Sequence, residues 1–543
     1  MSESVERVKG AWWGWGAGEE VPALSSQAEE MLSERFGGNL SPPAPAVQPS
    51  EVELPETRPM PRGLPGEIKG LLDDREPERL RHSVGMSYPD LVRLRSGRIE
   101  HAPDAVAHPR NADQVAALLA ECSRKGVAVV PFGGGTSVVG GVDPDRGGHD
   151  AVISVDLAGL DALAIDRRSG LARMGPGLRG PQVEEFLGRN GLTLGHFPQS
   201  FMRASVGGFA ATRSAGQASS GYGRFDDLVA SIELTTPIGS LRTLETPHTA
   251  AGPALREVAI GSEGTLGIIT EVTCRVRQAP DRRVYEGWIA EDFTAGCEAV
   301  REMAQSGEIP DVIRVSDEQE TDLGFAMSSA SPRIKSILAG YLQIRGKGGG
   351  SLMICGWEGT RDVVSRRRRS SRRRLKRAGA MALGRNPGRS WERSRFDGPY
   401  LRDHLIDRGI LVETLETAHT WAELDNLYQT VRESLRVNLG PGAIVMCHLS
   451  HAYRDGASLY FTFLAPVRPG DEIETWSRVK TAACDSIVAA GGTITHHHAV
   501  GRDHSAWMYP EVGEVGLEAL IGIKRRLDPE GIMNPGVLIP KPR

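Results

Sequence analysis

The sequence predicts an α+β protein with two or more domains, and three observations lead to this fold class. The chain has 543 residues, more than one hydrophobic core usually organises. Short apolar strand patterns and amphipathic helix patterns follow one another between residues 101 and 280. Beyond about residue 285, helix and strand patterns continue, which indicates a second domain.

The regular part of the chain begins with a helix after Asn111. Asn111 is a suitable N-cap, Gln114 follows three residues later, and Gly126 is placed to end the helix. Apolar residues recur at helical spacing between them: Val115, Leu118, Leu119 and Cys122. A short helix is expected from Pro181, and strands are expected at 127–132, 151–157, 172–175, 228–236, 264–272 and 459–463.

Three loops in the first region are too rich in Gly, Ser and Thr to be packed core elements. They cover residues 131–137, 196–216 and 261–267. Small residues allow a backbone to lie close to a flat, polar ligand. A Rossmann site needs a helix directly after its glycines, but residues 138–144 are turn-forming. The context therefore argues against a nicotinamide cofactor.

The composition limits the kinds of partner that the protein binds and the cellular compartment in which we expect it. A formal net charge of −5 argues against nucleic acid as a general partner. The six cysteines include no C-x-x-C pair, which favours reduced thiols over a disulfide framework or a zinc site. The acidic start and the lack of a run of about 18 apolar residues predict neither a secretory signal nor a transmembrane segment. We expect a cytoplasmic protein, with peripheral membrane contact and a homodimer left open.

Two segments outside the loops have two interpretations each. The tryptophans in residues 11–16 either dock an N-terminal arm on the body or form part of a wall around an apolar substrate. A Pro-rich linker follows at 41–46. The arginine-rich run at 366–377 is either a solvated helix face or a dock for anionic lipid headgroups.

The three glycine-rich loops resemble the FAD-binding domain of the vanillyl-alcohol oxidase class of flavoproteins. The resemblance implies a PCMH-type FAD-binding domain of two subdomains plus an α+β cap domain for the substrate. The expected boundaries are an N-terminal arm and linker at 1–100, the FAD-binding domain at 101–282, the cap domain at 283–490 and a C-terminal segment returning to the flavin at 491–543.

The same resemblance assigns the residues that contact FAD. Members with covalently attached FAD usually have a histidine in the first glycine loop, where this chain has Thr136, so we expect non-covalent FAD. The implied cofactor residues are Pro131, Phe132, Gly133, Gly134, Gly135, Thr136, Ser137, Pro198, Gln199, Ser200, Ala204, Ser205, Gly207, Gly208, Thr212, Arg213, Ser214, Ala215, Gly261, Ser262, Glu263, Gly264, Thr265, Gly267 and Ile268.

Segments at 312–317, 400–403, 447–463 and 493–502 resemble the alkyldihydroxyacetonephosphate synthases, and the triple histidine at 496–498 is the most specific part. The resemblance covers nearly the whole chain. It implies that the acyl group of acyl-dihydroxyacetone phosphate is exchanged for a long-chain alcohol, with release of a fatty acid and no net change in the flavin's redox state. Such chemistry needs a general acid/base next to the ketone and cationic groups for the carboxylate and the phosphate.

The resemblance also assigns the catalytic residues. Tyr453 matches the acid/base tyrosine, although it could instead be a cross-strand aromatic partner. Arg402 matches a substrate-contacting arginine and Arg314 a second arginine needed for activity; either could be an ordinary surface arginine. His496, His497 and His498 match the histidines beside the flavin. If they lie on a strand, at most two of them face one site. We expect no metal, although His448 and His451 leave that alternative open.

The alternative function is that of an FAD-dependent D-2-hydroxyacid dehydrogenase of the lactate or glycolate type. The tail at 532–536, Ile-Met-Asn-Pro-Gly, resembles those enzymes. They usually carry Gly-Glu-His-Gly-Ile-Gly where this chain has His-His-His-Ala-Val-Gly at 496–501. They also carry Asp-Gly-Asn-x-His where this chain has Asp-Gly-Ala-Ser-Leu at 455–459. Both differences remove groups used in hydride removal, so the synthase reaction is preferred.

Overall fold

The computed structural model describes residues 13–15, 24, 26–38, 40–44, 47–327 and 332–540. These residues form two compact units, and each unit contains separate stretches of the chain. We call the first the loop unit, because it holds the three glycine-rich loops; it comprises 46–216, 223–279 and 497–543. The second, the sheet unit, comprises the described residues before Ala46, together with 217–222 and 280–496.

The loop unit contains a four-stranded sheet of order β1-β2-β4-β3, a five-stranded sheet of order β5-β6-β10-β8-β9, and the pair β7-β11. Its strands are β1 Leu72–Asp73, β2 Ala105–Ala107, β3 Val127–Phe132, β4 Ala151–Asp156, β5 Leu163–Asp166, β6 Leu171–Met174, β7 Leu192–Thr193, β8 Val229–Thr236, β9 Gly239–Arg242, β10 Ile268–Arg275 and β11 Arg277–Gln278. Its helices are α2 Gly66–Lys69, α3 Glu76–Arg81, α4 Tyr88–Ser96, α5 Ala112–Lys125, α6 Gly180–Arg189, α7 Val206–Ala211, α9 Phe225–Leu228, α10 Leu255–Ala259 and α19 Met508–Leu527.

Helix α5 fixes the strand that carries the first glycine loop. The Asn111 side chain accepts a hydrogen bond from the Gln114 backbone N–H at 2.9 Å, and Gly126 ends the helix at a φ of 66°. The predicted apolar face of the helix is buried against β3 and β4, and it also contacts β8 and β10 of the other sheet. The helix and the strand at 127–132 are confirmed, and residues 138–144 are not helical.

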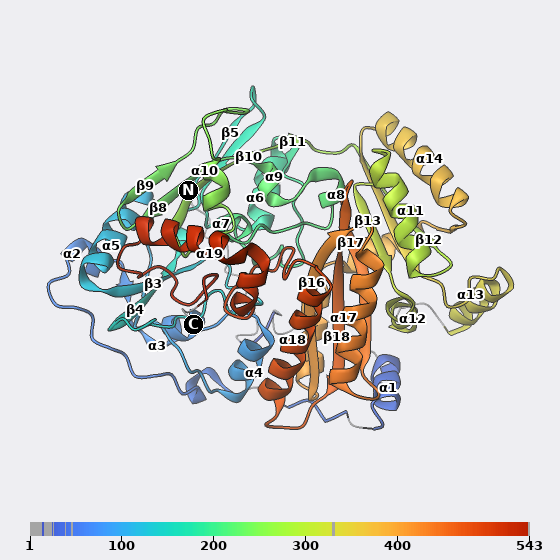
Figure 1. Ribbon diagram of the computed structural model, residues 1–543, viewed down its shortest axis with the longest axis horizontal. Helices are drawn as coiled ribbons and strands as arrows, with labels where there is room; N and C mark the ends of the chain where they lie inside the picture. The colour runs from blue at the N-terminus through green and yellow to red at the C-terminus, as the bar shows by residue number, and fades with distance from the viewer. Residues whose placement is uncertain are drawn as a thin grey trace. The chain divides into compact units, whose positions relative to one another are not determined.

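The sheet unit is built on one antiparallel seven-stranded sheet of order β15-β12-β14-β13-β17-β18-β16. Its strands are β12 Arg282–Ile289, β13 Val312–Ser316, β14 Leu352–Gly359, β15 Met381–Gly384, β16 Ile410–Thr420, β17 Ile444–Ala452 and β18 Gly456–Pro466. Its helices are α1 Ser26–Arg35, α8 Ser219–Tyr222, α11 Phe293–Gln305, α12 Glu318–Met327, α13 Pro332–Ile344, α14 Arg361–Arg377, α15 Asn386–Ser394, α16 Gly398–Ile406, α17 Leu424–Leu439 and α18 Glu472–Ala489. Helices α17 and α18 pack together, and α17 lies on β16, β17 and β18 (Figure 1).

Strands β17 and β18 form a hairpin that holds Tyr453 in its turn. The register runs from Ile444 opposite Leu464 to Ala452 opposite Ala457, and the Tyr453 N–H donates to the Gly456 carbonyl at 2.8 Å. The strand predicted at 459–463 is confirmed as part of β18. Tyr453 lies just outside both strands, so the alternative interpretation as a cross-strand aromatic partner does not hold.

The expected N-terminal arm and linker at 1–100 are divided between the units: the described residues up to 44 belong to the sheet unit, and residues 47–100 belong to the loop unit. Trp15 is buried, and its backbone N–H donates to Asp403 Oδ2 at 2.6 Å. Leu32 and Phe36 of the arm share a hydrophobic cluster with Ile410 of β16. These contacts favour the docking interpretation of the tryptophan cluster, of which Trp12 lies outside the described residues. None of the helices in the described ranges has the length and hydropathy needed to cross a membrane.

Candidate active site

The three glycine-rich loops meet in the loop unit. A Cβ atom on Gly133 would overlap Ser205 Oγ, and one on Gly134 would overlap the Arg203 carbonyl oxygen, so these positions require glycine. The third loop is hydrogen-bonded to the second: the Gly261 and Glu263 N–H groups donate to the carbonyls of Ala210 and Ala211 at 2.9 and 3.0 Å. The three loops, which are far apart in the sequence, therefore pack against one another.

Two buried polar atoms in this unit suit a polar ligand. Ser262 Oγ and His196 Nδ1 are both buried and have no hydrogen-bond partner among the described residues. Burial, with the nearby charge of His497, lowers the pKa of His196 to about 3, so this ring is neutral. Buried polar atoms are nearly always hydrogen-bonded in native proteins. The loops and these unsatisfied atoms fit a bound flavin nucleotide.

Glu263 joins the third loop to the C-terminal segment. Its carboxylate accepts hydrogen bonds from the backbone N–H groups of Val500 and Gly501 at 2.9 and 2.7 Å. Asn534 Nδ2 donates to the Glu263 carbonyl at 2.7 Å and to the Gly141 carbonyl at 3.0 Å. Burial raises the pKa of Glu263 to about 7, although the two N–H donors oppose this shift.

This raised pKa predicts a specific pH dependence of stability. The folded protein retains the Glu263 proton up to about pH 7, whereas the unfolded chain loses it near pH 4.5. The contribution of Glu263 to the free energy of unfolding therefore falls as pH rises from about 4.5 to 7, by roughly 3 kcal/mol. Thermal melts of wild type and Glu263→Gln at pH 5 and pH 8 test this. The variant should lose less stability between the two pH values, and parallel losses would contradict the prediction.

In the sheet unit, Tyr453 contacts one of the three predicted histidines. Tyr453 Oη and His496 Nε2 lie 2.7 Å apart, within hydrogen-bonding distance. Tyr453 is half-buried and His496 is buried. A hydroxyl bonded to an imidazole in a partly dry environment can both release and accept a proton.

A second histidine, His451, packs against His496 of this pair. The ring of His451 stacks on that of His496 with centroids 5.2 Å apart. Ser219 Oγ of α8 lies 2.5 Å from His451 Nδ1, so a hydrogen bond fixes the His451 ring. The sequence singled out His451 only as an alternative metal ligand. Ser219 was missed, because it lies 232 residues from His451 in the chain.

Glu416 of β16 fixes the backbone of His496. Its carboxylate accepts hydrogen bonds from the His496 N–H and, at 2.8 Å, from Thr495 Oγ1. Thr417 Oγ1 of the same strand donates to the Thr493 carbonyl at 2.6 Å. Sequence reasoning missed Glu416. The available signal was a carboxylate within a run of strand-forming residues, Ile410–Thr420, since carboxylates are rarely buried unless they are paired.

The other two histidines lie beyond the point where the chain leaves the sheet unit. The chain passes into the loop unit between His496 and His497, and residues 495–500 form no strand. The three histidines therefore do not lie on a strand with alternating side chains, and the limit of two histidines facing one site does not apply. The rings of His497 and His498 contact each other edge to face, with centroids 4.9 Å apart. Ala499 follows with a positive φ of 77°, which turns the backbone.

Arg402 is buried in the sheet unit next to a carboxylate. Its Nη2 lies 3.3 Å from Glu413 Oε1, and its Nε donates to the Val412 carbonyl at 3.1 Å. Glu413 also accepts a 2.6 Å hydrogen bond from Trp476 Nε1. The alternative of an ordinary surface arginine does not describe this buried side chain.

Arg314 belongs to a different charged group. Its Nη2 lies 2.7 Å from Glu320 Oε1, and His448 Nδ1 lies 3.1 Å from the same oxygen. Burial opposes ionisation of Glu320, but the charges of Arg314 and His448 outweigh it and hold the Glu320 pKa well below its usual range. Burial and the Arg314 charge lower the pKa of His448. The described residues give Arg314 no hydrogen bond to Tyr453 or His496.

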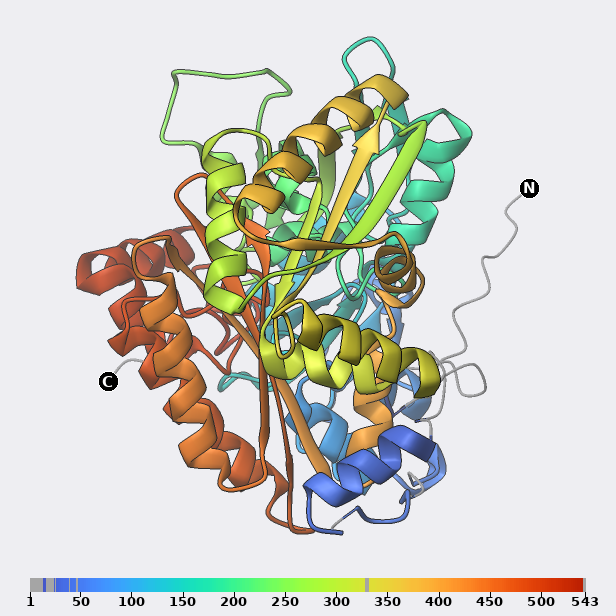
Figure 2. The same ribbon diagram turned by 90° about the vertical axis from the view of Figure 1, so that its right-hand side faces the viewer.

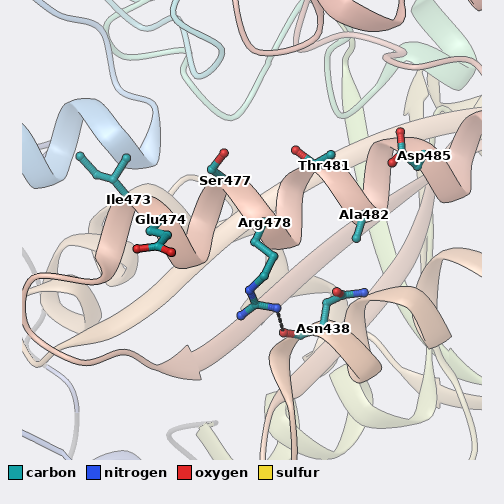
Figure 3. A pocket seen from close by; sticks show the side chains of 8 residues that line it. All are labelled: Asn438, Ile473, Glu474, Ser477, Arg478, Thr481, Ala482 and Asp485. Carbon is teal, nitrogen blue, oxygen red and sulfur yellow. Dashed lines mark hydrogen bonds between the residues drawn. The ribbon is translucent and has the colours of Figure 1, made fainter.

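A surface hollow between α17 and α18 does not contain these groups. Figure 3 shows that polar side chains line it, and Arg478 Nη1 donates to the Asn438 carbonyl there at 2.7 Å. Its lining contains none of the predicted catalytic residues, so it is separate from the candidate site.

Comparison with known proteins identifies the family. The protein-family model described as "FAD binding domain" matches residues 103–245, and the family model described as "FAD linked oxidases, C-terminal domain" matches residues 279–538. An alkyldihydroxyacetonephosphate synthase of Trypanosoma brucei brucei is 34% identical over 478 residues, covering 86% of this chain and 78% of that protein. The chain belongs to the alkyldihydroxyacetonephosphate synthase family.

Solved structures agree with this assignment. One alkyldihydroxyacetonephosphate synthase structure matches with a TM-score of 0.82 at 28% identity, covering 97% of this chain and 98% of that one. p-Cresol methylhydroxylase with substrate bound matches with a TM-score of 0.63 at 15% identity, covering 87% of this chain and 94% of that one, which shows a shared fold. The predicted fold class, the predicted family and FAD as the cofactor are confirmed.

Proposed function

We propose that the chain exchanges the acyl group of an acyl-dihydroxyacetone phosphate for a long-chain alcohol, which yields an alkyl-dihydroxyacetone phosphate and a fatty acid. Membership of the family supports this reaction. The observation within the structure that carries it is the 2.7 Å approach of Tyr453 Oη to His496 Nε2.

The loop unit would hold FAD on its three converging loops. Bound FAD supplies a ring system that accepts an electron pair from the substrate and later returns it. The close backbone packing of Gly133 and Gly134 and the unsatisfied Ser262 Oγ support this placement. Glu263 keeps the third loop attached to residues 500 and 501.

Tyr453 would remove the proton from the carbon next to the ketone. His496 Nε2 would take the phenolic proton as this occurs and return it later, so that the pair ends the cycle unchanged. This role needs His496 to stay in place, and the hydrogen bond from its backbone to Glu416 supports that. The His451 ring, held by Ser219, limits its rotation.

The two arginines would bind the anionic groups of the substrate. A planar guanidinium can pair with both oxygens of a departing carboxylate. Arg402 is already oriented by the Val412 carbonyl and by Glu413, which reduces the cost of fixing it around a substrate. Arg314 is about one-third exposed and keeps donors available for a phosphate.

Two parallel incubations distinguish the proposed reaction from the dehydrogenase alternative. The FAD-containing protein is mixed with acyl-dihydroxyacetone phosphate and a labelled long-chain alcohol, and separately with D-lactate or glycolate and a dye acceptor. We expect labelled alkyl-dihydroxyacetone phosphate, with one fatty acid released for each molecule formed. Dye reduction by a hydroxy acid without ether formation would favour the dehydrogenase.

We also predict that the FAD is held without a covalent bond, because Thr136 stands where covalently attached relatives have histidine. Acid precipitation should leave all of the yellow chromophore in the supernatant, as measured by its visible absorbance. Chromophore that remains in the washed pellet would contradict this prediction.

A further inference from the structure

His448 of β17 is held through one of its ring nitrogens. Its Nδ1 lies 3.1 Å from Glu320 Oε1, and its ring stacks on that of Tyr460 with centroids 4.9 Å apart. Helix α12, yellow-green in Figure 2, carries Glu320 in its first turn and packs on β17. The other ring nitrogen, Nε2, makes no hydrogen bond with any described residue. The structure therefore fixes the ring and leaves Nε2 available to a ligand.

Glu320 determines which nitrogen of His448 carries the proton. Burial opposes ionisation of Glu320, but the Arg314 charge holds its pKa well below its usual range, so the carboxylate is ionised. An ionised carboxylate only accepts hydrogen bonds, so Nδ1 must donate to it. Burial and the Arg314 charge lower the pKa of His448, so its ring is neutral at pH 7. In this tautomer Nε2 has a free lone pair and can accept a proton.

Arg314 presents further donors on the same face of the sheet. Its Nη2 bonds to the same oxygen of Glu320 at 2.7 Å, and it forms no other hydrogen bond with a described residue. Ser316 of β13 lies opposite His448. Arg314 lies two residues before Ser316 on the strand, so its side chain leaves the sheet on the same side as His448. One carboxylate thus anchors a guanidinium and an imidazole beside each other.

This face of the sheet leads to the candidate catalytic pair. Tyr460 of β18 lies opposite His448, and Glu416 of β16 lies opposite Tyr460. Glu416 accepts the hydrogen bond from the His496 N–H. Two strand spacings separate His448 from Glu416, a backbone distance of about 10 Å. The arrangement suits a short substrate that has its reacting carbon near His496 and an anionic group near His448.

We propose that Arg314 and His448 form the phosphate subsite for the dihydroxyacetone phosphate part of the substrate, and that His448 gains a proton when the phosphate dianion binds. The proton would lie between Nε2 and a phosphate oxygen, and Arg314 would supply a fixed positive charge. The charged groups that face His448 are Glu320 and Arg314, and they oppose each other in their effect on its protonation. The added negative charge of the phosphate then favours the imidazolium. The proposal rests on the proposed function for the identity of the substrate.

The test measures binding of dihydroxyacetone phosphate to the full-length, FAD-containing protein. Calorimetry at pH 7.5 in two buffers of different ionisation enthalpy gives the number of protons taken up. The ligand is a dianion at this pH, because the second pKa of a phosphate monoester is about 6. Wild type should take up at least about half a proton for each ligand bound. Its dissociation constant should rise by about tenfold or more from pH 7 to pH 9, because the complex holds a proton that the free protein lacks.

Two substitutions separate the contributions of the two ring nitrogens. His448→Asn keeps an amide near the position of Nδ1 and removes Nε2, so affinity should fall by about tenfold or more and proton uptake should vanish. His448→Gln places an amide near the position of Nε2, where it can donate but cannot titrate. Affinity should then be partly retained, while proton uptake again vanishes. His101→Gln is the matched control, because Asp143 holds His101 Nδ1 at 2.9 Å as Glu320 holds that of His448. It should bind like wild type.

Wild-type proton uptake in either His448 variant, or wild-type binding that does not change between pH 7 and pH 9, would overturn the proposal. Failure of wild type to bind dihydroxyacetone phosphate, or equal binding of dihydroxyacetone without its phosphate, would do so as well. A protein that binds with proton uptake but forms no ether from the labelled alcohol would contradict the proposed reaction and leave the phosphate subsite standing.

Discussion

Replacing Tyr453 with phenylalanine should lower turnover by on the order of 10²-fold or more, the usual contribution of a positioned acid/base. Only one oxygen is lost, and it is the one that lies 2.7 Å from His496 Nε2. The hairpin turn depends on the Tyr453 backbone, so the fold and bound FAD should be retained. Product formation gives the rate, and the flavin absorbance band gives the cofactor content.

Tyr428→Phe is the matched control for this variant. Tyr428 also lies in the sheet unit, and its hydroxyl donates to Asp317 Oδ2 at 3.2 Å in a buried setting. Loss of that hydrogen bond should cost about 1 kcal/mol of stability and leave turnover largely intact. In wild type, substrate should cause the flavin band to fade and then recover, whereas Tyr453→Phe should scarcely fade. Normal fading and turnover in Tyr453→Phe would reassign the proton transfer to one of His496, His497 and His498.

Arg402→Lys should also lower turnover strongly, by on the order of 10²-fold, as for loss of a preorganised charged donor. A lysine ammonium can still lie near Glu413, which avoids an uncompensated buried carboxylate. It cannot also donate to the Val412 carbonyl and present a planar pair of donors to a carboxylate. The turnover number and the Michaelis constant for acyl-dihydroxyacetone phosphate are measured together with the melting temperature.

Arg408→Lys provides the comparison for this second variant. Arg408 lies two residues after the end of α16, donates to the His404 carbonyl at 3.1 Å and pairs with Glu29. It belongs to the docking of the N-terminal arm and not to the predicted site. Both substitutions should lower the melting temperature to a similar extent, but only Arg402→Lys should lose turnover. Equal turnover in the two variants would show that Arg402 has a structural role only.

The elements that local patterns define could be predicted closely from the sequence. The helix capped by Asn111 and the strand at 127–132 depend on neighbouring residues, and the structure contains them. The second glycine-rich segment is not a loop throughout, because residues 206–211 form helix α7, which buries Val206, Phe209 and Ala210 in a hydrophobic cluster. The histidines at 496–498 do not lie on a strand, so the limit of two histidines facing one site, which assumed a strand, does not apply. The backbone turns after the histidines, where Ala499 and Gly501 have positive φ values, and the alternation of residue types in the sequence does not predict this turn.

The residues that hold Tyr453 and His496 in place could not be predicted from local sequence patterns. Tyr453 and His496 were identified through family resemblance, but their hydrogen bond joins residues 43 positions apart. Ser219 and Glu416 act through contacts that only the tertiary fold creates. The insertion of residues 217–222 into the sheet unit also leaves no mark in composition or spacing.

The interrupted path of the chain has a consequence for biosynthesis. Strand β3 is synthesised long before residue 532, yet the Val129 N–H donates to the Ile532 carbonyl at 2.8 Å, and the Asn534 N–H donates to the Val129 carbonyl at 2.8 Å. Asn534 also secures the carbonyls of Gly141 and Glu263. Vectorial folding, in which N-terminal domains fold as they emerge, cannot complete this unit. Its assembly must wait until residues 532–534 have been made, so this unit is completed only after residues 280–496 of the sheet unit have been synthesised.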